Sequence, residues 1–415
     1  MKETLAFAFI SILCLSMFLA FAPKVKAQQS STVPTTPTLL WKYTFSSGGV
    51  SSPAVSNGIV YVVGNRVVNA LNAANGAKIW NYKTGGQVFS SPAVGGGVVY
   101  VGSGIDVYAF NASNGNELWY DETFADVLVP PTVVNDVVYV GSSDYKVYAL
   151  FANNGSELWG FTTGGYVDSS PAVVNGVVYV GSFDDNVYAL KASSGAKLWN
   201  YTTGWAVWSS PAVVDGVVYF SSYDGNVYAL NATNGDKLWN YTTGGNVIPS
   251  PNIVGGVILS PDVVGGVVYV GSFNDNVYAL NATNGNKLWN YTTGGNVLPP
   301  AVAGGVVYAC SNDGSLYALN ATNGNKLWNY FIGSNVGSPA VVNGVIYADG
   351  GNNVYALGSP TSSSSQPTSS PSPTSSNALV IVIEVVFVVI IVAAAIFLMF
   401  KKRLKTEPPL LWVSL

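Results

Sequence analysis

Short apolar runs rich in valine and tyrosine alternate with turns containing glycine, asparagine and aspartate along most of the chain. In the unit from residue 209 to residue 242, four such runs are separated by the turn signals Asp215-Gly216, Asp224-Gly225 and Asn234-Gly235. Runs of strand length joined by such turns are typical of β-hairpins, and the unit leaves no room for a helix. Each unit is therefore predicted to be a four-stranded antiparallel sheet.

A tryptophan recurs near the end of each unit, at intervals of 39 or 40 residues apart from one step of 50. A fixed period of this length indicates a repeat architecture, in which sheets with two apolar faces must stack on one another. A large flat ring suits the boundary between two sheets, so we interpret these tryptophans as structural. They are Trp41, Trp80, Trp119, Trp159, Trp199, Trp239, Trp289 and Trp328.

The two ends of the repeat region complete each other. The last unit ends at Leu357 without a tryptophan strand, whereas Trp41 has no unit in front of it. This predicts an all-β fold over residues 39–358, an eight-bladed β-propeller of four-stranded antiparallel blades, in which residues 39–45 form the outer strand of the last blade. Closing the ring removes open sheet edges. A seven-bladed ring or an open solenoid would leave Trp41 without a role.

The segment Ala229-Leu-Asn-Ala-Thr-Asn-Gly-Asp-Lys-Leu-Trp239 resembles the tryptophan-docking repeat of the pyrroloquinoline-quinone (PQQ) propeller superfamily, and the motif occurs seven times. That superfamily includes quinoprotein dehydrogenases and the propeller lipoprotein of bacterial outer-membrane assembly. The resemblance implies that Gly235 makes the turn and that the tryptophan wedges between blades. In the dehydrogenases it also implies PQQ, calcium, a catalytic aspartate, adjacent cysteines in many members and long loops. This chain has nearly minimal loops and no adjacent cysteines, so we expect no cofactor.

The segments that flank the propeller indicate export and anchoring. Residues 1–27 have the charge, apolar run and small residues of a signal peptide, and residues 28–38 form a short linker. Residues 359–377 are a stalk rich in serine, proline and threonine, and residues 378–400 are apolar enough to cross a membrane as a helix. Basic residues open the tail, 401–415, so we expect a single-pass cell-membrane protein with an extracellular propeller and a cytoplasmic C-terminus.

The composition excludes several kinds of chemistry. The chain has no histidine, so it has no histidine-based triad, general base or zinc site. Residues 28–377 carry 10 lysines and arginines against 18 aspartates and glutamates, which argues against nucleic-acid binding. Cys310 is the one cysteine left after signal removal and is expected to be a small buried residue. Aspartate-bearing hairpins suit tight turns better than calcium loops, so no metal site is expected.

One end of the propeller varies from blade to blade. Its interblade linkers and the hairpins between second and third strands carry aromatic and acidic residues, whereas Asn246, Asn296 and Asn335 mark plain linkers. Such a rim suits a protein or glycan partner, and the alternative is drift between duplicated units with aromatics filling the channel. Tyr166, Asp168, Trp205 and Trp208 are expected to form one patch. The candidate binding residues are Phe89, Asp126, Tyr145, Tyr166, Asp168, Phe183, Asp184, Trp205, Trp208, Tyr223 and Phe273.

Two further patterns follow the repeats. Asn-x-Ser/Thr sequons mark candidate glycosylation sites, although the same letters are copied with each blade. They are Asn111, Asn154, Asn200, Asn231, Asn240, Asn281, Asn290 and Asn320. Residues 250–259 are repeated almost unchanged in residues 260–269, so only one copy can fill the inner position of its blade.

Together these observations favour a non-catalytic binding or scaffold module that is anchored in the membrane at the cell surface. The alternatives are a redox protein similar to the PQQ-dependent dehydrogenases and an envelope protein-assembly factor.

Overall fold

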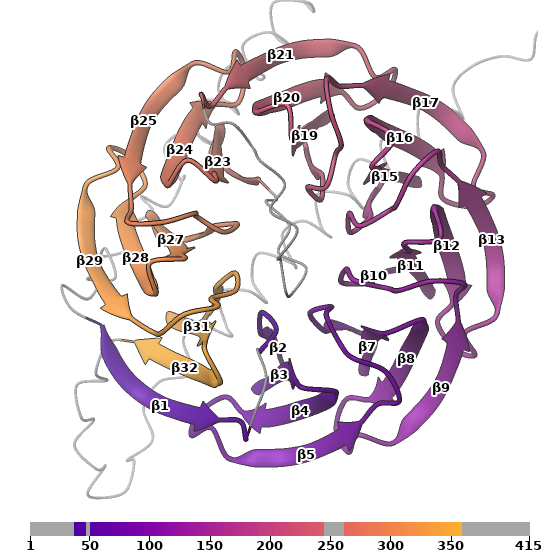
Figure 1. The fold of residues 1–415 in the computed structure, drawn as a ribbon, viewed down its shortest axis with the longest axis vertical. Helices are drawn as coiled ribbons and strands as arrows, with labels where there is room; N and C mark the ends of the chain where they lie inside the picture. The colour runs from indigo at the N-terminus through magenta and orange to yellow at the C-terminus, as the bar shows by residue number, and fades with distance from the viewer. Residues whose placement is uncertain (1–36, 47–49, 245–260, 359–415) are drawn as a thin grey trace, which may run out of the picture. The chain divides into compact units, whose positions relative to one another are not determined.

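The computed structural model describes residues 37–46, 50–244 and 261–358. Within them the strands form eight four-stranded antiparallel sheets, here called blades 1 to 8, arranged in a ring (Figure 1). The predicted eight-bladed propeller is confirmed. Among the described residues no helix is long and apolar enough to cross a membrane. The predicted signal peptide, stalk, transmembrane helix and tail lie outside the described residues.

The first strand of each blade lies nearest the axis, and each contacts the first strands of both neighbours, including those of blades 8 and 1 (Figure 1). These strands are three residues long and half-buried except at Val264, and each is preceded by a proline. The first strands are β2 (Ala54–Ser56), β6 (Ala93–Gly95), β10 (Thr132–Val134), β14 (Ala172–Val174), β18 (Ala212–Val214), β22 (Asp262–Val264), β26 (Ala301–Ala303) and β30 (Ala340–Val342).

The second and third strands form the buried middle of each blade because their valines, tyrosines and leucines face neighbouring blades on both sides. The second strands are β3 (Ile59–Gly64), β7 (Val98–Ser103), β11 (Val137–Gly141), β15 (Val177–Gly181), β19 (Val217–Ser221), β23 (Val267–Gly271), β27 (Val306–Ser311) and β31 (Val345–Gly350). The third strands are β4 (Val67–Asn72), β8 (Asp106–Asn111), β12 (Lys146–Phe151), β16 (Asn186–Lys191), β20 (Asn226–Asn231), β24 (Asn276–Asn281), β28 (Ser315–Asn320) and β32 (Asn353–Gly358).

The outer strands carry the repeat tryptophans. A β-bulge interrupts each outer pairing, so that the residue before the tryptophan points to solvent while the tryptophan turns inward, as at Leu158 and Trp159. The outer strands are β5 (Lys78–Lys83), β9 (Glu117–Glu122), β13 (Glu157–Thr162), β17 (Lys197–Thr202), β21 (Lys237–Thr242), β25 (Lys287–Thr292), β29 (Lys326–Phe331) and β1 (Thr38–Thr44).

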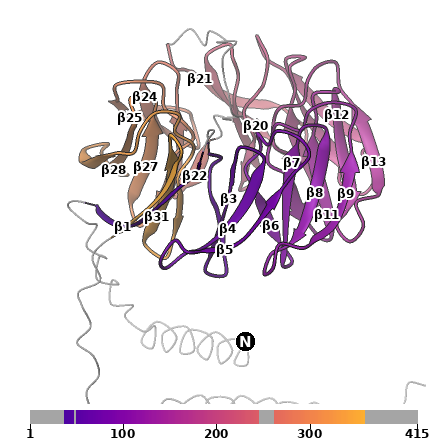
Figure 2. The ribbon, with the colours of Figure 1, turned by 60° about the horizontal axis from the view of Figure 1, so that its bottom comes forward.

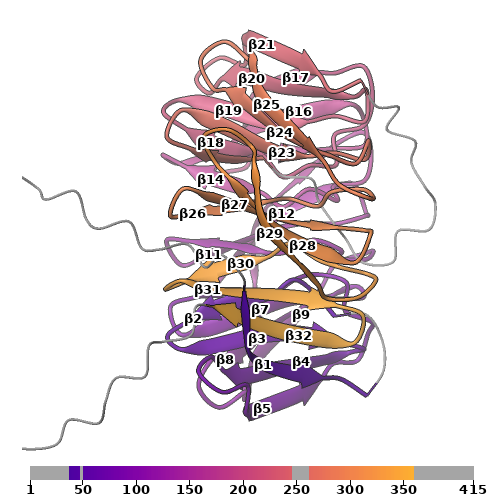
Figure 3. The same cartoon turned by 90° about the vertical axis from the view of Figure 1, so that its left-hand side faces the viewer.

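Strand β1 closes the ring. It pairs antiparallel with β32, in a register that runs from Thr38 opposite Gly358 to Thr44 opposite Asn353 (Figure 1, Figure 3). The bulge between Leu39 and Trp41 matches the bulges of the other outer strands. The strand therefore begins and ends one residue earlier than the predicted range of 39–45, but its place in the last blade is the predicted one.

Each interface between neighbouring blades has its own apolar core. At the closure, Trp41 and Val354 from blade 8 pack with Val60 and Leu71 from blade 1, as equivalent residues do elsewhere. In the duplicated segment the second copy supplies β22, while residues 250–259 lie outside the described residues. One copy thus fills the inner position, as expected.

Loops gather at two rims of the ring (Figure 2). At one rim, the described interblade linkers bond to the hairpin between the second and third strands of the following blade, as when Phe183 N–H donates to Tyr166 O at 2.9 Å. We call this end the linker rim. At the other end the remaining hairpins of a blade meet, as when Ala192 N–H donates to Gly176 O at 2.9 Å.

Candidate binding surface on the linker rim

A continuous row of aromatic rings crosses blades 3 to 5 on the linker rim. Ring centroids are 5.2 Å apart for Tyr145 and Tyr166, 5.8 Å for Tyr166 and Phe183, and 5.7 Å for Phe183 and Trp208. Trp208 then lies 5.5 Å from Tyr223, which lies 6.4 Å from Trp205. We call these six residues the aromatic row. Linkers supply Tyr166, Trp205 and Trp208, and hairpins supply the other three.

The aromatic row is exposed on one side and buried on the other. Trp205, Tyr166 and Tyr145 expose 47%, 46% and 43% of their surface, whereas Tyr223 exposes only 7%. Phe183 and Trp208 are half-buried between them. Two candidate aromatics lie outside the row: Phe89 on the linker before blade 2 and Phe273 on the hairpin of blade 6. The structure thus brings Tyr166, Trp205 and Trp208 into one patch through Phe183 and Tyr223.

Asp168 lies beneath this surface, which differs from the expectation that it belongs to the exposed patch. It is 6% exposed and accepts a hydrogen bond from Ser143 Oγ at 2.9 Å. Burial raises the pKa of Asp168 to about 6, the bond from Ser143 lowers it in part, and the charge of the exposed Asp126 raises it further. The rim of blades 3 and 4 therefore carries a partly protonated carboxyl below a charged one.

The candidate residue Asp184 links two neighbouring blades through hydrogen bonds. Its carboxylate accepts hydrogen bonds from Gly164 N–H, after the outer strand of blade 3, and from Tyr188 O–H, both at 2.6 Å. Burial opposes ionisation of Asp184, but these bonds and those from Asn186 outweigh it, so its pKa is lowered. Asp144, Asp224 and Asp313 make the same pair of contacts in their own blades.

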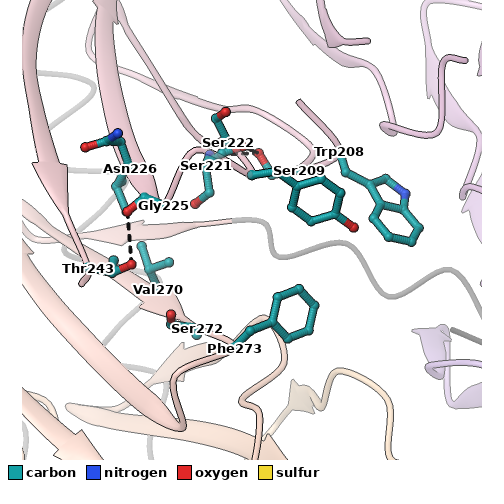
Figure 4. A pocket seen from close by; sticks show the side chains of 13 residues that line it. Trp208, Ser209, Ser221, Ser222, Gly225, Asn226, Thr243, Val270, Ser272 and Phe273 are labelled. Atoms are coloured by element: carbon teal, nitrogen blue, oxygen red, sulfur yellow. Dashed lines mark hydrogen bonds between the residues drawn. The ribbon is translucent and has the colours of Figure 1, made fainter. Parts of the chain in front are cut away.

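A small pocket with a cavity volume of about 30 Å³ lies beside the aromatic row, between blades 5 and 6. Trp208 and Phe273 lie at one end of it, and Asn226 and Thr243 lie at the other (Figure 4). Its walls also include Ser221, Tyr223, Val227 and Val270 from the second and third strands and the hairpin. The position of Ser221 is a glycine in blades 2, 3, 4 and 6, so an alignment of the repeats could have singled it out.

The repeat tryptophans hold the blades together. In one example, Trp159 Nε1–H donates to Ala192 O of the next blade at 2.8 Å, and Tyr139 O–H donates to the same carbonyl at 3.4 Å. The turn residue Gly195 has φ +68° and lies so close that a Cβ there would be 2.6 Å from the Trp159 ring. Seven tryptophans dock in this way. The indole N–H of Trp328 is buried without a partner.

Blade 8, which closes the ring, contains a buried carboxyl group. Asp349 on β31 is fully buried, and neither of its oxygens has a hydrogen-bond partner of good geometry. Burial raises the pKa of Asp349 well above its usual value, and backbone N–H groups of Asp349 and Gly337 offset this only in part. In blade 4 the position equivalent to Asp349 is Gly181. Its N–H donates a hydrogen bond to Oγ of Ser169, which lies twelve residues earlier in the chain. In blade 8 Gly337 replaces that serine and leaves room for the carboxylate.

The candidate glycosylation sites divide by position. Asn154, Asn200, Asn240 and Asn290 are exposed, and the last three donate through Nδ2 to an asparagine of the neighbouring third strand. Asn111, Asn231, Asn281 and Asn320 are half-buried where a third strand enters its hairpin. Their Oδ1 atoms accept bonds from backbone N–H groups two residues ahead.

The described residues do not assemble donors for the calcium that accompanies PQQ. Across these residues no three aspartate, glutamate, cysteine or histidine side chains come together as a group that could hold a metal ion. Asp168 and Asp349 are buried singly, and the Cys310 thiol is fully buried with a raised pKa. The described acidic residues and Cys310 therefore do not form the ligand group that calcium would need beside PQQ.

A family model described as outer membrane protein assembly factor BamB matches residues 33–143, 64–164 and 145–366. The chain belongs to this family. The PQQ-like propeller family that the docking motif suggested is therefore confirmed. A comparison with curated protein sequences finds no match.

Solved structures share the fold of this PQQ-like propeller. BamB from Moraxella catarrhalis is 20% identical with a TM-score of 0.66, over 78% of this chain and 100% of that one. A quinohemoprotein alcohol dehydrogenase from Comamonas testosteroni is 17% identical with a TM-score of 0.67, over 84% and 80%. The computationally designed Ika8 protein is 14% identical with a TM-score of 0.68, over 77% and 99%. At these identities the likeness extends to the fold alone.

Proposed function

We propose that this PQQ-like propeller is a non-catalytic binding module, anchored in the membrane at the cell surface, whose linker rim holds a protein or glycan partner. The observation that carries the proposal is the aromatic row, whose Tyr145, Tyr166 and Trp205 are exposed, whereas the linkers near Asn296 and Asn335 are plain. Exposed aromatic surface of this extent on a folded domain usually marks an interaction site.

The charge of the linker rim restricts the charge that a partner can carry. Asp126 is exposed beside the row, and the buried Asp168 is partly ionised at neutral pH. An anionic partner would be repelled by these carboxylates, so the proposal favours a neutral or basic one. The family to which the chain belongs is described as an outer membrane protein assembly factor, which supports a protein partner and leaves assembly as the related alternative.

The membrane part of the proposal rests on the sequence. The apolar residues 378–400 are long enough to span the hydrocarbon layer, and the basic residues that follow favour a cytoplasmic tail. Protease added outside intact cells should remove the propeller and leave a tag fused after residue 415 protected. Protection of the propeller instead would contradict this orientation.

A comparison of matched variants tests the binding role. Full-length protein in detergent is applied to an array of peptides and glycans, alongside the Tyr166→Ala/Trp205→Ala variant. The control is Leu198→Ala/Leu238→Ala, which removes two side chains, each 51% exposed, from the outer wall. We expect the wall variant to keep the parent's signals and the row variant to lose them. Equal signals from parent and row variant would refute the proposal.

The redox alternative has its own test. Full-length protein is titrated with PQQ and calcium, and dye reduction is followed with alcohols as substrates. A saturable quinone spectrum together with dye reduction would overturn the non-catalytic proposal. Unchanged spectra at saturating PQQ support it.

A further inference from the structure

The outer strand of blade 2 differs in charge from most other outer strands. Strand β9 reads Glu117-Leu-Trp-Tyr-Asp-Glu122, whereas β17, β21 and β25 all read Lys-Leu-Trp-Asn-Tyr-Thr. Residues 84–145, which include all of blade 2, carry seven aspartates and glutamates and no lysine or arginine. Strand β9 lies on the outer circumference of the ring, between β5 and β13 (Figure 1). The outer wall is therefore acidic at blade 2, and this blade supplies no basic side chain to balance it.

Two carboxyl groups lie opposite each other in the outer strand pair of blade 2. Asp106 on β8 is the direct partner of Glu122 on β9. In blades 4, 5 and 6 the same two positions hold an asparagine and a threonine, whose hydroxyl donates to the asparagine Oδ1 at 2.6 to 2.7 Å. Like charges directly opposite each other destabilise a sheet. Blade 2 thus has a repulsive pair where its sister blades have a hydrogen-bonded one, an exchange that folding alone disfavours.

Two tyrosines lie beside these carboxyl groups on the same face of the sheet. Tyr108 pairs with Tyr120, two residues along each strand, and side chains two residues apart on a strand point to the same side. Their rings stack, with centroids 5.6 Å apart and planes inclined by 29°. Tyr120 exposes 53% of its surface, whereas Tyr108 beneath it exposes 7%. Strands β17, β21 and β25 have an asparagine at the position of Tyr120, so the exposed ring belongs to blade 2.

Contacts with blade 1 support this face from below. Tyr108 O–H donates to Asp106 Oδ2 at 3.2 Å, and the Tyr108 ring lies 6.3 Å from the ring of Tyr82 on β5. Tyr82 O–H donates to Glu117 Oε2 at 2.5 Å, which links the outer strands of the two blades. Tyr120 and Glu122 remain exposed above these groups. The face therefore presents an aromatic ring and a carboxylate to solvent, each beside a more buried group of its own kind.

An arginine side chain has the chemistry that complements this face. Its guanidinium is planar and always charged, bonds to carboxylates through parallel N–H groups, and stacks on aromatic rings. Residues two apart on a strand are separated by roughly 7 Å, so a guanidinium between Glu122 and Tyr120 reaches both, because cation–π contacts extend to about 6 Å from a ring centroid. Its charge also offsets the repulsion between Asp106 and Glu122. A lysine ammonium supplies the charge but not the planar stacking.

We propose that the outer face of blade 2 binds an arginine-bearing segment of a partner protein, whose guanidinium pairs with Asp106 and Glu122 and stacks on Tyr120. This face is separate from the aromatic row, so the inference goes beyond the binding role proposed for the linker rim.

The test measures binding of a short fluorescent peptide of alternating arginine and serine to the full-length protein in neutral detergent, followed by fluorescence anisotropy. Asp106→Asn/Glu122→Thr introduces the asparagine and threonine of blades 4 to 6. We expect this variant to bind the peptide about tenfold more weakly, while its melting temperature stays the same or rises because the like-charge pair is gone. An affinity equal to that of the parent would overturn the proposal.

Asp136→Asn/Asp215→Asn is the charge-matched control. It also removes two carboxylates, but from exposed turns between the first and second strands of blades 3 and 5. Both positions have positive φ, 60° and 50°, a conformation that asparagine adopts readily. We expect this control to keep the affinity of the parent. An equal loss of affinity in both double variants would mean that the peptide responds only to net charge, and the site would be refuted.

Tyr120→Asn tests the stacking contact. We expect the parent to bind the arginine peptide several-fold more tightly than the same peptide with lysine, and Tyr120→Asn to remove this preference. Equal affinity of the parent for the two peptides, or a preference that survives the substitution, would contradict the proposed contact with arginine.

The two proposals fail separately. The Tyr166→Ala/Trp205→Ala variant should bind the arginine peptide like the parent, because the aromatic row does not include blade 2. Loss of peptide binding in this variant would place the peptide on the linker rim and overturn the inference. If the array signals depend on the row while the arginine peptide does not bind at all, the inference is wrong and the binding function of the linker rim stands.

Discussion

Two residue exchanges place a fully buried carboxyl group in blade 8, at a position where blade 4 has a glycine. Where blade 4 has Ser169 and Gly181, blade 8 has Gly337 and Asp349, so a small hydroxyl is replaced by a carboxyl. A serine could not stand at 337 beside this carboxyl, because a Cβ there would be 2.4 Å from Asp349 Oδ1. Cys310 faces the same region, and the charge of Asp349 adds to the effect of burial in raising the pKa of the Cys310 thiol. The two exchanges in blade 8 are therefore coupled.

We predict that Asp349→Asn flattens the dependence of stability on pH. The folded-state pKa of Asp349 is raised, so the folded protein holds its proton at pH values where the unfolded chain, with an ordinary pKa of about 3.9, has lost it. The stability from this group is therefore complete below about pH 4 and is lost as pH rises through the folded-state pKa, by up to about 1.4 kcal/mol per pH unit. Denaturant unfolding from pH 4 to pH 8 measures the slope.

Asp168→Asn is the control for this prediction. The pKa of Asp168 is raised to about 6, so its contribution has the same sign but ends near pH 6. The control should flatten only the acidic part of the curve. Identical slopes for Asp349→Asn and the parent would contradict the raised pKa.

At the scale of elements, seven hairpins between third and outer strands receive the tryptophan of the preceding blade, and the eighth hairpin does not exist. Blade 8 takes its outer strand from the other end of the chain, so β32 and β1 are not joined by such a hairpin. Trp328 consequently lacks the alanine carbonyl and the turn glycine that Trp159 finds at Ala192 and Gly195.

Because of this difference, replacing the repeat tryptophan by phenylalanine is predicted to cost more folding stability at Trp159 than at Trp328. Trp159→Phe loses packing and the bond to Ala192, whereas Trp328→Phe loses packing but removes an unpartnered donor. We expect Trp159→Phe to lower the free energy of unfolding by about 1 kcal/mol more than Trp328→Phe does. Denaturant titration of both variants measures the difference. A larger loss for Trp328→Phe would mean that its indole N–H has a partner.

For the whole molecule, the ring depends on β1. Trp41→Ala should lower the free energy of unfolding by about 3–5 kcal/mol, because this buried ring packs between blades 8 and 1. The neighbouring Leu40→Ala, on the exposed side of the bulge, is the control and should cost little.

Thiol labelling gives a second readout of closure. Cys310 is fully buried in the core shared by blades 7 and 8, so with Cys14 replaced by serine the native protein should resist a maleimide. Deleting residues 28–45 should speed the labelling and promote association through the uncovered edge of β32. A deletion variant that labels and elutes like the parent would show that β1 does not stabilise the ring.

The sequence predicts the architecture well because local signals that recur from blade to blade specify the fold. The tryptophan period, the turn residues and the unmatched Trp41 each indicate the same ring, and pairing of β1 with β32 follows from counting strands. The burial of a side chain on the linker rim cannot be predicted from these repeated signals. Tyr223 and Asp168 stand in loops, where the periodicity of a strand no longer tells which way a side chain points, and both are buried. The pocket depends on contacts between blades 5 and 6, which no single repeat contains.

Closure by β1 also determines how the ring resists a mechanical pull. In blade 8 the strand order is β1, β32, β31, β30, so the last described strand of the chain is flanked on both sides. Tension applied through Gly358 therefore meets two hydrogen-bonded ladders, whereas an edge strand would be held by one and could be peeled away. A partner that pulls on the linker rim would therefore apply force to blade 8 at β32, which is paired with a strand on each side.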